Sequence, residues 1–155
     1  MVLKIISGGQ TGVDRAALDF AIANNITHGG KCPNGRRAED GVLDEKYQLT
    51  ETAESESIHR TRANVQESDG TVVFTHGPLR GGSRITANHA SKRHKPCLHL
   101  DLKAFTPEKA AHHLHAWVAK NRIRILNIAG PRASHAPKIY ELVMQTLDLS
   151  FTRTP

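Results

Sequence analysis

A glycine-rich turn between a strand-like and a helix-like segment constrains the fold of this chain most. The turn, SGGQTGVDR, occupies residues 7–15 and follows the β-branched run 2–6. Apolar residues then recur at helical spacing, at Val13, Ala17, Phe20 and Ala21. Glycines let the backbone approach a ligand, and the first amides of a helix are unpaired and attract anions. We therefore expect this turn to hold a phosphate group.

The same arrangement occurs twice more. The strand-like run 71–75 leads into a turn containing GPLRGGS, in which Ser83 is expected to cap the following helix. The run 124–129 leads into GPRAS, again before a helix-like segment. Ligands of parallel α/β sheets bind beyond the carboxyl ends of the strands. The three turns should therefore meet at one edge of a sheet.

Strand-like and helix-like segments alternate along the whole sequence. Further strands are expected at 26–28 and 96–102, and further helices at 55–67 and 107–118. Residues 31–41 are too polar for regular structure and are expected to form an irregular loop, while 150–155 should be frayed. The alternation predicts an α/β fold with a mostly parallel sheet and helices on both faces, in three layers. A length of 155 residues fits a single domain, 1–155.

Composition favours a small anionic partner. The chain has 21 Lys and Arg against 15 Asp and Glu, for a net charge of +6. The arginines are spread over several loops and aromatic residues make up only 5%, so a nucleic-acid partner is not expected. No apolar run approaches the roughly 20 residues of a membrane span, so we expect a cytoplasmic protein without a membrane partner.

No metal site is expected from the spacing of potential ligands. Cys32 and Cys97 lie far apart and form no CxxC pattern. His112, His113 and His115 belong to one helix-like segment, but no cysteine or carboxylate accompanies them at a ligand spacing. Solvent-exposed histidines explain this pattern better.

Residues 31–41, KCPNGRRAEDG, combine adjacent arginines with adjacent acids. Arg36 and Arg37 suit bidentate binding of phosphate or carboxylate. Glu39 and Asp40 either pair with these arginines or act as a general acid or base. Asp14 has a similar ambiguity, because a carboxylate in a first helical turn either stabilises the helix or contacts a ligand such as a ribose hydroxyl.

A long, ordered string of motifs resembles the family called "putative molybdenum carrier". The matching segments are GGQTGVDRAALDFA, CPNGRRAEDG, YQLTET, RTRANVQESDGTVVF, GGS and LNIAGPR. This family is similar to the circularly permuted, YpsA-type branch of the SLOG superfamily. The resemblance implies a Rossmann-like fold, a nucleotide-like ligand and association into homo-oligomers, for which the helix face around Trp117 is a candidate.

The resemblance also carries residues over by motif. The family's first loop corresponds to Gly8, Gly9, Thr11, Gly12 and Asp14, its arginine-acid loop to Arg36, Arg37, Glu39 and Asp40, and its third turn to Gly81, Gly82 and Ser83. Phosphoribohydrolase relatives resemble a PGGxGTxxE pattern, whereas no glutamate occurs in residues 84–88 here. A hydrolytic acid would therefore have to come from another loop.

We expect a binding protein for a small phosphorylated ligand that is nucleotide-like or pterin-like, with molybdenum cofactor as one candidate. Asn127, Gln10 and Tyr47 are candidates for contacts to the edge of the base or pterin. Two alternatives stay open: a nucleotide hydrolase that uses Glu39, Asp40 or Asp14, and a DNA-binding protein. The residues expected to bind the ligand are Gly8, Gly9, Gln10, Thr11, Gly12, Asp14, Arg15, Arg36, Arg37, Gly81, Gly82, Ser83, Thr86, Asn127, Gly130 and Arg132.

Overall fold

The computed structural model describes residues 1–152 and contains one five-stranded sheet. Every neighbouring pair in this sheet is parallel, in the order β2-β1-β9-β7-β8. The strands are β1 (Lys4–Ile6), β2 (Thr27–Gly29), β7 (Gly70–Thr75), β8 (Cys97–Asp101) and β9 (Ile125–Ala129).

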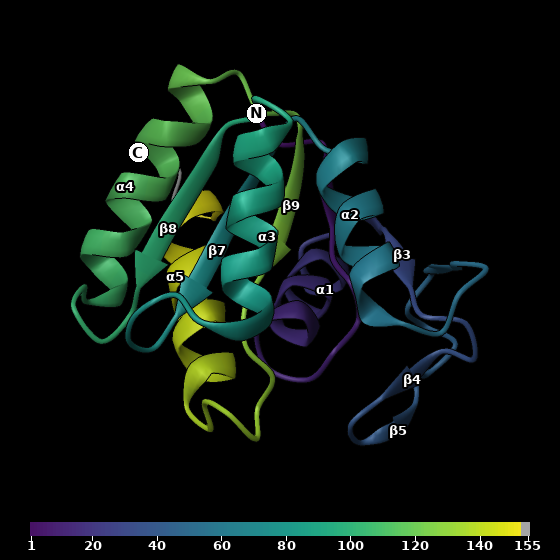
Figure 1. The fold of residues 1–155 in the computed structure, drawn as a ribbon. Helices are drawn as coiled ribbons and strands as arrows, with labels where there is room; N and C mark the ends of the chain where they lie inside the picture. Colours follow the sequence, from purple (N-terminus) through teal and green to yellow (C-terminus); the bar gives the residue numbers. More distant parts are fainter. Residues whose placement is uncertain (153–155) are drawn as a thin grey trace.

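Helices cover both faces of the sheet (Figure 1). They are α1 (Val13–Ala23), α2 (Ser57–Glu67), α3 (Gly81–Lys92), α4 (Pro107–Lys120) and α5 (Ile139–Phe151). α5 packs against both α1 and α4 on one face, and α2 packs against α3 on the other. The predicted three-layer, Rossmann-like α/β fold is confirmed.

The strand order creates a crevice in the middle of the sheet. The chain passes from β1 outward to β2 at one edge, and from β7 outward to β8 at the opposite edge. β9 then enters between β1 and β7. Because the connections diverge on the two sides of β9, the carboxyl ends of β1, β9 and β7 border a space that no crossover covers.

Apolar side chains fill the space between the sheet and the helices. β7 is buried along its whole length, as a central strand covered on both faces should be. Phe20 of α1, Phe74 of β7 and Ile128 of β9 belong to one fully buried cluster. Each such side chain contributes about 1.5–3 kcal/mol to folding, so the strand ends rest on a rigid base.

The segment expected as an irregular loop contains short strands. β3 (Lys31–Cys32) pairs in parallel with β6 (Thr50–Glu51), and β4 (Arg37–Ala38) forms an antiparallel hairpin with β5 (Gly41–Val42). Two-residue strands have no periodicity that a sequence can reveal. β3 is held instead by the Asn64 side chain of α2, which accepts from the amide of Lys31 at 2.7 Å and donates to its carbonyl at 3.1 Å.

Two smaller expectations were wrong. Ser83 does not cap α3, because the helix begins at Gly81 and Ser83 lies buried in its first turn. α5 continues through Ser150, whose buried hydroxyl donates to Thr146 at 2.7 Å, so this part of the tail is not frayed; residues 153–155 lie outside the described part. Trp117 is partly buried against the core, and the association into homo-oligomers stays a prediction. Within residues 1–152, no helix is long and apolar enough to cross a bilayer.

Candidate ligand-binding site

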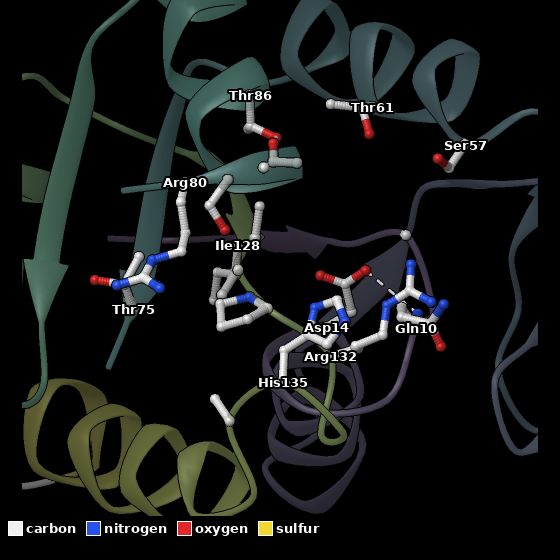
Figure 2. Close-up of a pocket in the computed structure, with 18 of the residues that line it drawn as sticks. Gln10, Asp14, Ser57, Thr61, Thr75, Arg80, Thr86, Ile128, Arg132 and His135 are labelled. Atoms are coloured by element: carbon white, nitrogen blue, oxygen red, sulfur yellow. Dashed lines mark hydrogen bonds between the residues drawn. The ribbon is translucent and has the colours of Figure 1, made fainter. Parts of the chain in front are cut away.

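A cavity of about 600 Å³ lies at the carboxyl ends of β1, β9 and β7 (Figure 2). The turns after all three strands contribute to its wall, as do the first two turns of α2. The prediction that the three glycine-bearing turns meet is confirmed. The polar lining residues are Gln10, Asp14, Ser57, Arg60, Thr61, Asn64, Thr75, His76, Arg80, Ser83, Thr86, Asn127, Arg132 and His135.

The turn after β1 is packed directly against the turn after β9. Gly12 has a φ of 79°, and a Cβ added there would lie 2.5 Å from the carbonyl oxygen of Pro131. Only glycine avoids this collision in the left-handed region. The amide of Val13 donates to the Pro131 carbonyl at 3.3 Å, and the amide of Ala133 donates to the Thr11 hydroxyl at 3.1 Å. These contacts hold the two turns together at the cavity.

The start of α3 is an open part of the wall. A Cβ added at Gly82 would meet no atom within 4 Å. Among the described residues, no side chain caps the helix at Arg80. The first amides of α3 are therefore available to an anion in the cavity, where the helix dipole adds attraction.

Asp14 and Arg60 form a partly buried pair beside the turn after β1. The Asp14 carboxylate accepts from the amide of Gln10 at 3.3 Å and lies 3.9 Å from the Arg60 guanidinium. Arg60 also donates to the carbonyl oxygen of Gly8 at 2.8 Å. Burial raises the pKa of Asp14, and the positive charge of Arg60 offsets this only in part. Asp14 is therefore easier to protonate than an ordinary aspartate.

Cationic groups reach the cavity from three elements. Arg80 precedes α3, Arg132 follows β9, and Arg60 comes from α2. Figure 2 shows Arg80 beside Thr75 at one end of the cavity and Gln10 at the other, with Ile128 and Asp14 between them. The positive charge is thus distributed over both ends.

A hydrogen-bond network fixes the turn after β7. The Thr75 hydroxyl donates to the carbonyl oxygen of Gly77 at 2.5 Å, and lies 2.7 Å from Nε2 of His99. Since the hydroxyl has a single proton, the imidazole Nε2 must be the donor in that second bond. Asp101 accepts from the amide of Gly77 at 2.7 Å. Two residues of β8, His99 and Asp101, therefore fix the position of the cavity wall around Thr75.

The acids of the arginine-rich segment lie outside the cavity lining. Glu39 accepts from the hydroxyl and amide of Ser134, at 2.6 and 3.1 Å, and from the Thr11 hydroxyl. These bonds lower its pKa. Asp40 forms a bidentate pair with Arg15, at 2.9 and 3.0 Å, which lowers the pKa of Asp40. Both acids pair with partners other than the expected Arg36 and Arg37, and they tie the β4–β5 hairpin to the rim.

The arginines of that segment also point elsewhere. Arg36 has a φ of 54° and donates to the carbonyl oxygens of Leu49, Asp44 and Tyr47. Arg37 is exposed in β4. The Tyr47 hydroxyl donates to Asp19. The predicted binding residues that line the cavity are Gly8, Gln10, Asp14, Gly81, Gly82, Ser83, Thr86, Asn127, Gly130 and Arg132, whereas Gly9, Thr11, Gly12, Arg15, Arg36 and Arg37 do not.

The contribution of α2 was missed by the sequence reasoning. Ser57, Arg60, Thr61 and Asn64 all line the cavity. Their spacing of three and four residues places them on one face of the helix, which is the detectable signal. The apolar stripe of α2 is thin, so the sequence did not indicate which face of the helix points toward the sheet and the cavity. Four other lining residues were not among the predicted binding residues: Thr75, His76, Arg80 and His135.

The fold and the cavity define a Rossmann-like α/β protein whose open site lies at the carboxyl edge of a parallel sheet. The chain belongs to the circularly permutated YpsA SLOG family, whose model matches residues 5–151. It is also similar to the crystal structure of a "putative molybdenum carrier protein" from Syntrophus aciditrophicus. The two chains share 49% identity with a TM-score of 0.95, over 97% of this chain and 95% of the other. No curated protein sequence matches significantly.

Proposed function

We propose that this protein binds a small phosphorylated ligand, nucleotide-like or pterin-like, in the cavity at the carboxyl edge of the sheet. One observation carries the proposal: the first turns of α1, α2 and α3 and the turn after β9 all line a single cavity of about 600 Å³. Helix starts and arginines attract phosphate, and this volume is within the usual range for small-ligand sites.

The proposed roles follow from position. The backbone around Gly8 and at the start of α3 would hold phosphate oxygens through amides. Arg60, Arg80 and Arg132 would neutralise their charge. Asn127 is buried beneath the cavity, where its amide already donates to the Thr71 hydroxyl at 3.2 Å, leaving its carbonyl oxygen for the edge of a base or pterin.

The name of the Syntrophus protein makes molybdenum cofactor a candidate ligand. The pterin part of that cofactor bears a phosphate, which suits the same amides and arginines. Over residues 1–152, no group of three or more His, Cys, Asp or Glu is arranged to hold a metal ion. Such a cofactor would therefore be a cargo recognised through its phosphate and its pterin.

A second candidate function is hydrolysis of a nucleotide at an N-glycosidic or phosphoester bond. The observation that favours it is Asp14, the one carboxylate in the cavity lining of the described residues, which is buried and has a raised pKa. A general acid needs such a pKa and needs to reach the reacting bond. Turnover that depends on Asp14 but not on Glu39 or Asp40 would support this function over binding alone.

Native mass spectrometry of the purified protein tests the proposal. The retained molecule is released by denaturation and identified, and molybdenum is assayed on the same sample. We expect a phosphorylated nucleotide or pterin in near-stoichiometric amount, and its loss from the Gly82→Val variant purified in parallel. Protein that is empty, and that also binds no nucleotide or pterin phosphate added at millimolar concentration, would overturn the proposal.

A further inference from the structure

The cavity has cationic groups at two separated ends. Arg80 belongs to the segment after β7, whereas Arg60 and Arg132 lie toward the turn after β1. Two observations place Arg60 and Arg132 there: Arg60 donates to the carbonyl oxygen of Gly8, and Figure 2 shows Arg132 beside Asp14. A single phosphate bound at one end would leave the arginines at the other end without an anionic partner.

The distance between the two ends follows from the sheet. β9 lies between β1 and β7, so two strand spacings separate the segments that follow β1 and β7. Neighbouring strands are about 4.8 Å apart, which puts the two strand ends roughly 10 Å from each other. A single phosphate is too small to contact both ends of the cavity. A ligand that carries one anionic group on each side of a sugar is long enough to do so.

The middle of the cavity favours a hydrogen-bond donor. Figure 2 shows Asp14 between Arg80 and Gln10, with its side chain directed into the cavity. Its carboxylate is bonded to one amide and faces Arg60 at 3.9 Å, which leaves acceptor positions free. An ionised carboxylate repels phosphate but accepts from a sugar hydroxyl. The order along the cavity is therefore cation, acceptor, cation.

We infer that the ligand is a nucleotide-like molecule whose sugar separates two anionic groups, with a sugar hydroxyl bound by Asp14, as in a nucleoside bisphosphate. This inference rests on the proposed function. Arg80 and Arg132 hold the two anionic groups from opposite ends, and the backbone amides around Gly8 and at the start of α3 complete their coordination. Each end contributes independently to affinity.

Three matched probes test the inference by isothermal titration calorimetry: adenosine 5′-monophosphate, adenosine 3′,5′-bisphosphate and 2′-deoxyadenosine 3′,5′-bisphosphate. We expect the ribose bisphosphate to bind at least about tenfold more tightly than the monophosphate, because a second charge-assisted phosphate contact is added. The deoxy probe should bind several-fold more weakly than its ribose counterpart, and Asp14→Ala or the more conservative Asp14→Asn should remove that difference.

Two variants test the contributions of the two ends of the cavity separately. Arg80→Gln and Arg132→Gln should each weaken the bisphosphate about tenfold, whereas the monophosphate should respond to only one of them. Arg84→Gln is the matched control, because Arg84 is exposed at the start of the same helix and is not in the lining.

The outcomes distinguish failure of this inference from failure of the proposed function. A monophosphate that binds as tightly as the bisphosphate overturns this inference and leaves the proposed function standing. Equal binding of the ribose and deoxy bisphosphates overturns the role of Asp14. If no probe binds and the purified protein retains no phosphorylated molecule, the proposed function and this inference both fail.

Discussion

Arg60 of α2 donates a hydrogen bond of 2.8 Å to the carbonyl oxygen of Gly8 in the turn after β1. The two residues are 52 positions apart in the sequence. A Cβ at Gly8 would come within 2.5 Å of the guanidinium, so the absence of a side chain there makes the contact possible. The same guanidinium faces Asp14, and α2 thereby supports the turn that we propose holds phosphate.

Arg60→Gln should weaken both the fold and the binding of phosphorylated ligand. The Gly8 carbonyl loses a charge-assisted bond in a partly buried position, which should lower the free energy of unfolding by about 1–3 kcal/mol. Affinity for a phosphorylated ligand should fall about tenfold or more. Urea unfolding and calorimetry measure the two effects. Arg62→Gln, two positions along the same helix but outside this cavity, should leave both unchanged.

Gly82→Val should abolish ligand binding while preserving the fold. A Cβ at this position meets no protein atom within 4 Å, and its φ is outside the left-handed region, so the backbone tolerates a side chain. The branched side chain would occupy the space in front of the first amides of α3. We expect a change in unfolding free energy below about 1 kcal/mol. Ala116→Val on the exposed face of α4 is the control; unchanged affinity in Gly82→Val would exclude α3 from the site.

Asp14 should make the protein less stable as pH rises from acid toward neutral. Burial raises the pKa of this carboxyl above its ordinary value of 3.8. The folded state therefore binds the proton more tightly than the unfolded state, so the stabilisation is complete below about pH 3.8 and is lost as pH rises through the raised pKa. Asp14→Asn removes the titration. The unfolding free energy of the wild type minus that of Asp14→Asn should fall with rising pH, and a flat difference would contradict the environment described for Asp14.

Glu39 should show the opposite dependence. The bonds from Ser134 and Thr11 hold its pKa below the ordinary 4.5, so its contribution to stability is present above that value and is lost as pH falls through the lowered pKa. Urea unfolding of Glu39→Gln between pH 3 and 6 should show a shallower loss of stability in acid than the wild type.

Neither acid of the β4–β5 hairpin should matter for chemistry in the cavity. Glu39 and Asp40 are bonded to the rim and lie outside the lining. Glu39→Gln and Asp40→Asn should therefore leave ligand affinity within about threefold of the wild type, which calorimetry measures. A loss of binding in Asp40→Asn with an intact fold would show that the hairpin participates directly.

Much of the architecture could be predicted because its signals are local. The apolar run of β7 and the capped start of α4, where Thr106 accepts from Lys109 and Pro107 opens the helix, are specified by neighbouring residues. The short strands β3 and β6 had no such signal, because they exist through pairing with each other and with Asn64.

The sequence by itself determined the alternating parallel fold and the three glycine-bearing turns, since the spacing of apolar residues and the placement of glycines act over a few positions. The tertiary structure alone decided which side chains face the cavity. It brought Arg60 and Asn64 of α2 to the site and directed Arg36, Glu39 and Asp40 to other partners. Most of those outcomes depend on contacts between residues tens of positions apart, and such contacts form only when the helices pack against the sheet.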